Sequence, residues 1–220
     1  MLDKRVVVLI SGQGRNLQAL IEGVQAARIP ARLAAVISNR AEAPGLLRAR
    51  AAGIPTQVLS HRDYDSREAY DEALAQTVAE YAPDIVALAG FMRILTPRFT
   101  QPYAGRMLNI HPSLLPRHPG LDTHQRTLAA GDAEHGATVH FVTAALDGGP
   151  RVIQGRFTVQ PQDDVAALAQ RVMQQVEMRI YPQAVSWMAR GELALQGDQA
   201  WFRGKPLTEP LGLSDLEEGF

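Results

Sequence analysis

The chain has 220 residues, and its 22 basic and 23 acidic side chains give a formal net charge of −1. This balance disfavours extended binding to nucleic acid, and no apolar run approaches the roughly 18 residues that a membrane-spanning helix requires. The sequence has no cysteine, which excludes a disulfide scaffold, a thiolate metal site and a cysteine nucleophile and suits a cytoplasmic protein.

Strands and helices are predicted to alternate through the first half of the chain. Runs of β-branched apolar residues predict strands, and apolar residues at helical spacing between them predict helices. In the helix predicted over residues 65–81, Asp65 is the expected N-cap and Glu68 completes a capping box. The other predicted helices span 17–27 and 44–53, and the predicted strands span 5–10, 33–38, 56–59, 84–89 and 106–110. This rhythm indicates βαβ units around a parallel sheet.

The pattern changes after residue 137. Strands predicted at 138–143 and 151–159 leave no room for a helix between them, so they make the sheet mixed. Asp163 or Asp164 is the expected cap of a last long helix, which Pro182 is expected to kink. Its apolar stripe is Val165, Leu168, Val172, Val176 and Ile180. A small hairpin is predicted at 192–207. The expected organisation is one domain over residues 1–207, followed by a mobile acidic tail at 208–220.

A glycine-rich loop, SGQGRN, follows the first predicted strand at residues 11–16. In an open α/β sheet, the N–H groups at this helix start bind anions, and glycines let a phosphate approach. Leu17 replaces the third glycine of a dinucleotide fingerprint, no acidic residue closes the second strand, and the Gly-Lys-Ser/Thr of a P-loop is missing. The loop therefore favours a single phosphate monoester. The alternative is a tight turn that needs glycine only for steric reasons.

The predicted strand at 106–110 leads into a histidine that is followed by proline. Asn109 and His111 share one face of an extended segment, because side chains two residues apart point the same way. Pro112 cannot continue a strand ladder and ends it there. An amide donor beside an imidazole at the carboxyl end of a strand suits the stabilisation of an oxyanion. A hydrogen bond between the two side chains within the core is the alternative.

Two further segments lie next to predicted strand ends. The LDGGP sequence places Asp147 on a glycine-flanked loop, where its carboxylate can orient or charge a histidine; a plain Asp-Gly turn is the alternative. The GFMRIL sequence at 90–95 follows the fourth predicted strand, and its Phe and Met suit a flat aromatic ligand if they are exposed, or the core if they are not. Five of the six histidines fall between residues 111 and 140, but their spacing matches no zinc pattern, so no metal site is predicted.

Taken together, these motifs resemble the glycinamide ribonucleotide formyltransferases, the folate-dependent enzymes of purine biosynthesis. The resemblance runs from about residue 5 to residue 202 and rests on VLISGQGRNLQAL, AVISNR, DSREAYD, LAGFMRILTP, GRMLNIHPSLLPRHPG, HGATVHFV, LDGGP and IYPQAVSW. It implies a Rossmann-like formyltransferase fold: an open, mostly parallel, doubly wound α/β sheet with antiparallel C-terminal strands and a long C-terminal helix. It also implies 10-formyltetrahydrofolate as the formyl donor, 5'-phosphoribosyl-glycinamide as the acceptor, and no metal.

The resemblance also implies roles for particular residues. Asn109, His111 and Asp147 match the catalytic trio, and Glu177 matches the acid that contacts the glycinamide substrate. The residues that match the phosphate loop are Gly14, Arg15 and Asn16, and those that match the folate cleft are Met92, Arg93, Ile94, Leu95 and the loop from Val142 to Asp147.

The sequence departs from the family at two positions. Arg15 stands where the family more often has serine, and Asp122 stands where it often has histidine, whereas His124 still matches. Two predictions stay open for the Arg15 side chain: it makes a charge-assisted contact with the phosphate, or it points into solvent. Any contact from position 122 is in doubt.

Three alternatives compete with this prediction. Formyltetrahydrofolate hydrolase shares the Asn–His–Asp trio but usually carries an N-terminal regulatory domain, for which a first strand at residue 5 leaves no room. Methionyl-tRNA formyltransferase adds a C-terminal RNA-binding domain and a basic surface. A non-catalytic binder of folate or of a phosphorylated metabolite has no need of the trio. The expected partners are small-molecule substrates, with no nucleic acid or membrane, and monomer and homodimer both stay open.

Overall fold

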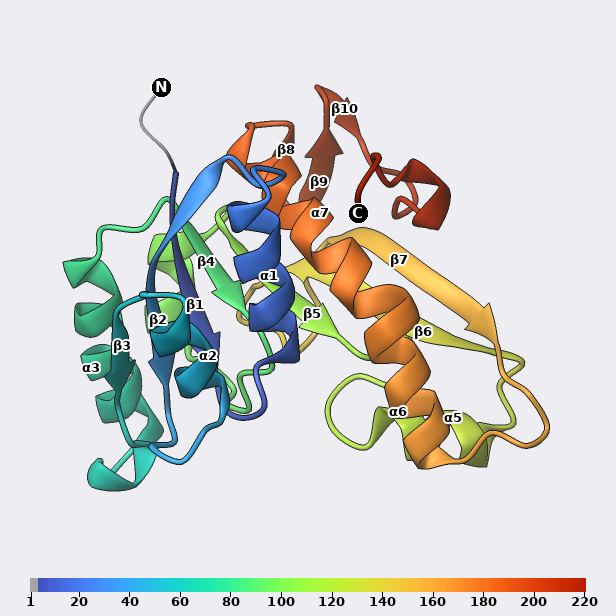
Figure 1. Ribbon diagram of the computed structural model, residues 1–220, viewed down its shortest axis with the longest axis horizontal. Helices are drawn as coiled ribbons and strands as arrows, with labels where there is room; N and C mark the ends of the chain where they lie inside the picture. The colour runs from blue at the N-terminus through green and yellow to red at the C-terminus, as the bar shows by residue number, and fades with distance from the viewer. Residues whose placement is uncertain (1–3) are drawn as a thin grey trace.

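A mixed seven-stranded sheet forms the centre of the protein, in a computed structural model that describes residues 4–220 (Figure 1). The first three residues of the predicted domain lie outside the described part. The five parallel strands are followed by two that each run antiparallel to the strand before, which confirms the predicted mixed sheet. In spatial order the strands are β3 (Thr56–Val58), β2 (Ala31–Ser38), β1 (Lys4–Ile10), β4 (Ile85–Leu88), β5 (Met107–His111), β6 (Glu134–Phe141) and β7 (Arg151–Thr158).

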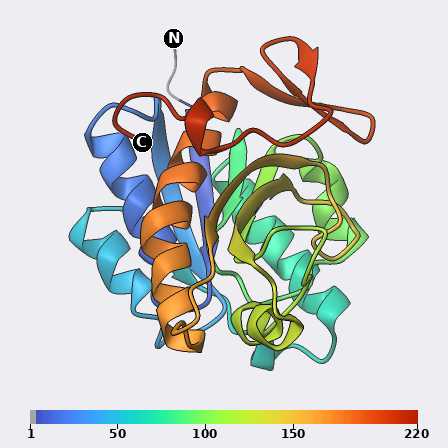
Figure 2. The same ribbon diagram turned by 90° about the vertical axis from the view of Figure 1, so that its right-hand side faces the viewer.

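Helices cover both faces of this sheet, as the edge view in Figure 2 shows. On one face lie α1 (Arg15–Gln25), α2 (Gly45–Ala51) and α7 (Met178–Ala189), and on the other lie α3 (Arg67–Glu80) and α4 (Pro97–Thr100). The sequence of β1 explains this arrangement, because its side chains alternate between the two layers. Val6, Val8 and Ile10 pack into the first core, and Val7 and Leu9 pack into the second.

The long C-terminal helix is continuous but irregular. It begins with α6 (Val165–Arg171), and the Asp164 side chain accepts from the third N–H after it at 2.8 Å, which selects Asp164 as the cap. A π-helical segment (Val172–Glu177) then joins α6 to α7. The irregularity therefore lies about one turn before Pro182. Proline has no N–H, so the carbonyl of Met178, four residues earlier, lacks its helical donor, and Met178 directly follows the π-helical segment. The predicted stripe is buried except at its first residue, Val165, which is exposed.

One local prediction is wrong, and some short helices were not predicted. Ser66, and not Asp65, caps α3, because the extended backbone of Ser66 lets its hydroxyl accept from the Ala69 N–H at 3.1 Å. The helix α5 (Thr123–Ala130) is an element that its weak apolar pattern did not predict. The same holds for three short 3₁₀ helices at His61–Asp63, Gln101–Tyr103 and Leu213–Asp215. No helix within residues 4–220 is long and apolar enough to cross a membrane.

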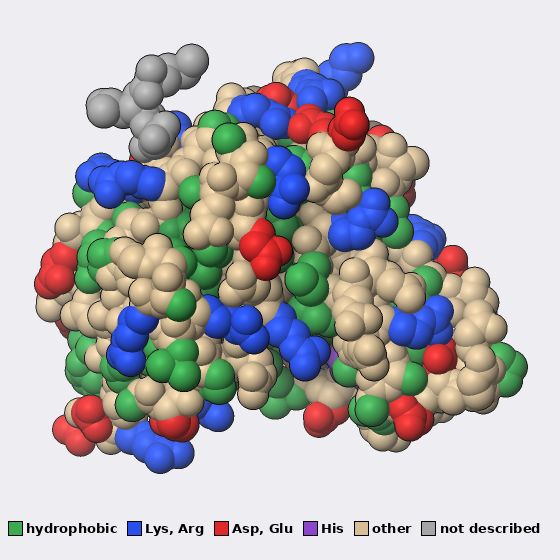
Figure 3. Space-filling model, viewed as in Figure 1, with side chains coloured by type: hydrophobic (Ala, Val, Ile, Leu, Met, Phe, Trp, Pro, Cys, Tyr) green, Lys and Arg blue, Asp and Glu red, His purple; other side chains and the backbone are tan. Residues whose placement is uncertain are grey.

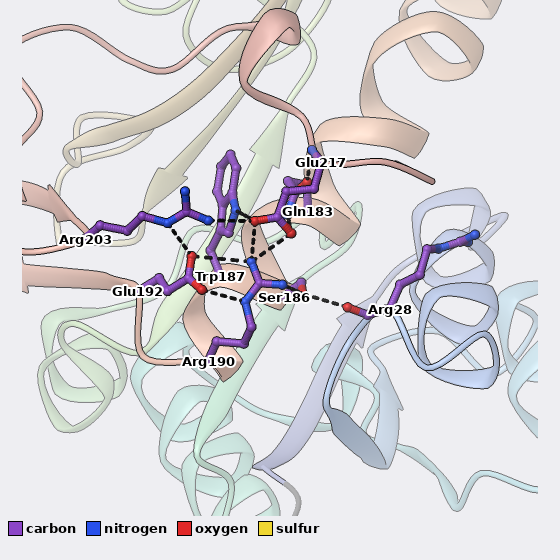
Figure 4. Close-up of polar contacts among 8 residues, drawn as sticks. All are labelled: Arg28, Gln183, Ser186, Trp187, Arg190, Glu192, Arg203 and Glu217. Carbon is purple, nitrogen blue, oxygen red and sulfur yellow. Dashed lines mark hydrogen bonds and ion pairs between the residues drawn. The ribbon is translucent and has the colours of Figure 1, made fainter.

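The predicted hairpin is part of a small antiparallel sheet of β8 (Leu193–Gln196), β9 (Gln199–Phe202) and β10 (Lys205–Pro206). The segment 208–220, expected to be mobile, is instead held against the body. Leu211 exchanges backbone hydrogen bonds with β7. Figure 4 shows the Glu217 carboxylate among Trp187, Arg190 and Arg203, whose N–H groups donate to it at 2.6–3.2 Å. The acidic residues of this segment suggested mobility, but one of them, Glu217, pairs with Arg190 and Arg203 from other elements.

Candidate active site

The site lies where the carboxyl ends of the parallel strands meet the loops that follow them. The loop after β1 is tied to the segment after β4, because the Ser11 N–H donates to the Gly90 carbonyl at 3.1 Å and the Ser11 hydroxyl accepts from the Met92 N–H at 2.7 Å. β5, the neighbour of β4, ends there with His111. Open α/β sheets bind ligands at this edge, where the strand order reverses, here between β1 and β4.

The structure brings the three predicted catalytic residues together. Asn109 and His111 project from β5, and Asp147 approaches from the loop between β6 and β7. The Nδ1 atom of His111 lies 3.4 Å from Oδ2 of Asp147, and these two side chains are only 7% and 8% exposed. The Gly120 N–H donates to the same Asp147 oxygen at 2.8 Å. A buried carboxylate that faces an imidazole does more than complete a turn, so this geometry supports the functional interpretation of Asp147.

His140 is a further member of this cluster, and no role is predicted for it from the sequence. The antiparallel register of β5 and β6 places His140 opposite Asn109. Nδ2 of Asn109 donates to Nε2 of His140 at 3.1 Å, and Nδ1 of His140 donates to the Phe141 carbonyl at 2.8 Å. The same Nε2 atom lies 3.6 Å from Oδ1 of Asp147. His140 thus joins Asn109 to Asp147, and the one signal for it in the sequence is the pairing register of two strands.

Burial lowers the pKa of His111, which opposes the predicted charging of this ring by Asp147. Two acceptors act in the opposite direction: Nε2 donates to the His118 carbonyl at 2.9 Å, and Nδ1 faces Asp147. A neutral imidazole can donate from only one nitrogen, so acceptors on both sides favour the doubly protonated ring. Positive charge on the His140 ring, when that ring is protonated, and on Arg126 adds to the effect of burial. In the ligand-free protein the imidazolium therefore forms below the ordinary histidine pKa of about 6.5.

Asp147 is held in its ionised form. Burial alone would raise the pKa of its carboxyl, but the interaction with His140, the Gly120 N–H and the charge of His111 outweigh burial and hold this pKa below its ordinary value. The backbone of Asp147 has φ +48°, a region that Asp and Asn adopt more readily than other non-glycine residues. The site therefore contains a carboxylate at neutral pH, on a backbone that asparagine can also adopt.

The glycine loop and Glu177 lie side by side although they are 161 positions apart. Asn16, in the first turn of α1, donates from Nδ2 to Oε2 of Glu177 at 2.5 Å, and both side chains are buried. Burial raises the pKa of the Glu177 carboxyl, and the hydrogen bond from Asn16 opposes this. Within residues 4–220, the Oδ1 atom of Asn16 is buried without a hydrogen-bond partner. The predicted phosphate loop and the acid predicted to contact the glycinamide thus lie next to each other in the structure.

Gly14 has a steric role in the loop. Its φ of +69° favours glycine, and a Cβ atom added there would lie 2.7 Å from Cα of Gly45. We expect Gly14→Ala to destabilise the protein by at least about 1–2 kcal/mol, the cost of a left-handed alanine alone. Gly12→Ala is the matched control, because its Cβ would meet no atom of the described residues within 4 Å. Urea unfolding of both variants checks this, and a Gly14→Ala protein as stable as Gly12→Ala would contradict it.

A hollow of about 700 Å³ opens beside the start of α1. Arg15, the first residue of that helix, and Arg48 of α2 line it, and across from them Gln170 and Gln174 line it from α6 and the π-helical segment. Figure 3, viewed as Figure 1, shows basic side chains gathered over the start of α1 and α2 along this hollow. Arg48 also donates from Nε to the Gln13 carbonyl at 2.9 Å, which fixes it against the glycine loop. The hollow therefore offers positive charge and amide groups beside the predicted phosphate loop.

The segment expected to contact folate divides between surface and core. Met92 and Ile94 are 62% and 49% exposed, whereas Leu95 is buried in the second core. Arg93 lies over the Tyr70 ring, with its guanidinium carbon 5.4 Å from the ring centroid. Val142, also expected in the cleft, packs partly buried against the same core. Of the four residues predicted on the segment after β4, Met92 and Ile94 expose apolar surface, whereas the side chain of Leu95 is buried.

The clustered histidines make contacts within the protein. His124 and His135 share a hydrogen bond of 2.8 Å, Thr127 bonds the other nitrogen of His135 at 3.1 Å, and His118 pairs with Asp132 at 2.7 Å. Among residues 4–220, no group of three or more His, Asp or Glu side chains is arranged to hold a metal ion. Asp122 is exposed at the start of α5 and lies outside the cluster of Asn109, His111, His140 and Asp147.

Comparison with known proteins agrees with this geometry. The formyl transferase family model matches residues 4–185. The chain is 52% identical over 202 residues to a phosphoribosylglycinamide formyltransferase of Escherichia coli, covering 92% of this chain and 95% of that protein. A relative of the same name from Haemophilus influenzae is 46% identical over 206 residues, which cover 94% of this chain and 97% of the relative.

Solved structures show the same relationship. A phosphoribosylglycinamide formyltransferase from Coxiella burnetii superposes with a TM-score of 0.91 at 46% identity, covering 96% of this chain and 99% of that one. A glycinamide ribonucleotide transformylase from Symbiobacterium toebii superposes with a TM-score of 0.88 at 44% identity, covering 91% and 94%. With matches of this extent in sequence and in fold, the chain belongs to the formyl transferase family, and within it to the phosphoribosylglycinamide formyltransferases.

Proposed function

We propose that the protein transfers the formyl group of 10-formyltetrahydrofolate to the amino group of 5'-phosphoribosyl-glycinamide in purine biosynthesis. The observation that carries this proposal is the buried contact of 3.4 Å between His111 and Asp147, beside Asn109 and at the ligand-binding edge of the sheet. In this proposal residues 1–207 act as one formyltransferase domain in the cytoplasm. The partners are these small molecules, without a metal, nucleic acid or membrane, and a homodimer stays open beside the monomer.

Asn109 and His111 are proposed to stabilise the oxyanion of the reaction. Attack of the neutral amine on the formyl carbon forms a tetrahedral centre and moves negative charge onto the formyl oxygen. Nδ2 of Asn109 carries two hydrogens and uses one toward His140, which leaves the other for that oxygen. The contact of Nδ1 of His111 with Asp147, at 3.4 Å, is longer than a good hydrogen bond, so the Nδ1–H of the doubly protonated ring can exchange it for the oxyanion.

Asp147 is proposed to act in proton transfer during the reaction. The attacking amine must lose a proton, and the folate nitrogen that leaves the formyl carbon must gain one. Asp147 is ionised, faces His111 and His140, and can accept the amine proton directly or through a water molecule. As negative charge grows on the formyl oxygen, the His111 imidazolium becomes more favourable, because an opposite charge nearby raises its pKa.

The two substrates are proposed to approach from different sides of β5. The phosphate of the ribonucleotide binds the first N–H groups of α1 at Gly14, Arg15 and Asn16, which the positive end of the helix dipole supports. The unpartnered Oδ1 atom of Asn16 and the carboxyl of Glu177 are placed to contact the glycinamide part. Folate is proposed to lie along Met92 to Leu95 and the loop from Val142 to Asp147, where Met92 and Ile94 expose apolar surface.

Arg15 is expected to contribute to phosphate affinity and not to chemistry. Its exposed side chain lines the hollow beside the glycine loop together with Arg48, so Arg15→Ser removes one of two positive charges there. We expect the KM for the ribonucleotide to rise about fivefold to tenfold with an unchanged kcat and a weaker dependence of KM on salt. Arg32→Ser, at an exposed position on β2, is the control and should leave KM unchanged. An unchanged KM in Arg15→Ser would place this side chain in solvent.

The proposed reaction is tested by following 10-formyltetrahydrofolate with and without the ribonucleotide. Consumption of the donor only when the amine is present is the expected result. Consumption without the amine would mean a hydrolase, and no consumption in either case would mean a binder. Either of these outcomes would overturn the proposal.

A further inference from the structure

Residues 112–122, the loop between β5 and α5, supply backbone atoms to both members of the His111–Asp147 pair. The carbonyl of His118 accepts from Nε2 of His111 at 2.9 Å, and the N–H of Gly120 donates to Oδ2 of Asp147 at 2.8 Å. The imidazole and the carboxylate are thus each oriented by a backbone group from the short stretch 118–120. Whatever holds this stretch also sets the geometry of the pair.

The two halves of the loop are held differently. The first half is bonded to the sheet: the Thr138 hydroxyl donates to the Ser113 carbonyl, and the Gln154 amide donates to the Leu115 carbonyl, both at 2.7 Å. The second half is held by side chains from α5 and from the residues just after it. Arg126 of α5 donates to the carbonyls of Pro119 and Leu121, and Asp132 contacts His118.

His118 has an unfavourable backbone conformation that serves the site. Its φ is +54°, a left-handed conformation that is unfavourable for a non-glycine residue. In this conformation the carbonyl meets His111, while Nε2 of the side chain lies 2.7 Å from Oδ2 of Asp132. The contact with Asp132 is therefore placed to offset the cost of the conformation that presents the carbonyl.

Asp132 is itself fixed and charged. It follows Gly131, the left-handed residue that ends α5, and its N–H donates to the Thr127 carbonyl at 3.2 Å, so the helix end sets its backbone. Its side chain, 16% exposed, also lies 3.2 Å from Nη1 of Arg117. The hydrogen bond with His118 and the charge of Arg117 hold the pKa of Asp132 below its ordinary value. Asp132 is thus an ionised residue with a fixed backbone position, and it lies outside the cluster of catalytic residues.

We propose that Asp132 is a positioning residue for formyl transfer: it holds His118, and through the backbone of residues 118–120 it orients His111 and Asp147. This inference rests on the proposed function, but its effect on His111 exists without substrates. Asp132 touches neither member of the pair directly. Its influence passes through the two backbone hydrogen bonds of residues 118 and 120.

Kinetics of Asp132→Ala is the first test. We expect kcat to fall about tenfold or more, because small displacements of reacting groups can cost up to about 100-fold, while the KM of each substrate stays within about twofold. Asp132→Asn keeps an acceptor for His118 and should recover most of the loss. The control is Arg117→Ala, which removes the other contact of Asp132 and should leave kcat near wild type. A kcat of Asp132→Ala within threefold of wild type would overturn the proposal.

A double-variant cycle tests whether the effect passes through His118. Glycine adopts positive φ without cost, so in a His118→Gly background the carbonyl no longer depends on Asp132. We expect Asp132→Ala to cause no further loss of kcat there. If instead the two losses multiply, Asp132 acts by another route and the proposal fails.

The imidazole NMR titration of His111 in the ligand-free protein separates this proposal from the proposed function. The hydrogen bond to His118 raises the pKa of His111, so its loss in Asp132→Ala should move the midpoint of the titration down. The other groups that act on the His111 site, namely Asp147, His140, Arg126 and His124, remain in the variant. An unmoved midpoint contradicts positioning even if the enzyme transfers formyl groups, and a moved midpoint supports it even if the substrate assignment fails.

Discussion

Replacing His111 or Asn109 by alanine is expected to slow turnover by about 100–1,000-fold, which is the typical cost of removing one oxyanion donor. Both residues project from β5 at the edge where ligands bind, and both carry N–H groups next to Asp147 and His140. Their donation to the formyl oxygen strengthens as charge develops, so kcat should fall much more than the affinity for either substrate.

Kinetics with both substrates and the melting temperature of each variant check this expectation. His111 is buried, and Asn109 is bonded to His140, so a stability measurement is needed to separate lost chemistry from a damaged fold. Arg32→Ser again serves as the control for an exposed side chain far from the site. If a folded His111→Ala or Asn109→Ala enzyme kept its turnover within about threefold of wild type, the oxyanion role of that residue would be wrong.

The second large effect is expected for Asp147→Asn, which removes the charge and keeps the shape. Asparagine tolerates φ +48° and can still accept from the Gly120 N–H, so the fold should be retained. Turnover at neutral pH should fall by more than about tenfold, since a proton-transfer group typically contributes about 100–10,000-fold. The charge of Asp147 raises the pKa of His111, so its loss should lower the His111 pKa beyond the effect of burial.

The pH dependence gives this variant a second measurement. In wild type, burial already places the pKa of His111 below its ordinary value, so the imidazolium fraction grows as pH falls toward and below about 6.5. In Asp147→Asn the midpoint of the His111 titration should lie at still lower pH. If Asp147 were only a turn residue, asparagine would serve the Asp-Gly turn equally well. An active variant with an unmoved His111 titration would remove Asp147 from the mechanism.

The core of the fold could be predicted from the sequence, because its strands are short apolar runs that must be buried on both faces. β1 is an example: five successive apolar residues have no solvent face, and the structure divides them between two cores. α5 was not predicted because THQRTLAA has little apolar periodicity, and contacts such as that of its buried Thr127 with His135 are tertiary. The C-terminal segment was not predicted to dock because the partners of Glu217 come from α7 and β9–β10.

The candidate site was predictable where its members are close in sequence. Asn109 and His111 share a strand face, and that periodicity is local. His140 was missed because its place opposite Asn109 depends on the register of an antiparallel pair. The hydrogen bond from Asn16 to Glu177 and the contact of Asp132 with His118 likewise depend on packing that local spacing does not encode. The sequence shows the carboxylate that can raise the pKa of His111, but the burial that lowers this pKa depends on tertiary packing.

Direct transfer of the formyl carbon to the glycinamide nitrogen can be observed by NMR with two labels. The wild-type protein would receive 10-formyltetrahydrofolate with ¹³C in the formyl group and the ribonucleotide with ¹⁵N in the glycinamide amine. A one-bond coupling between ¹³C and ¹⁵N should appear at the rate at which the donor is lost, and Asn109→Ala should slow both equally. Free ¹³C-formate without this coupling would contradict formyl transfer at the site formed by Asn109, His111 and Asp147.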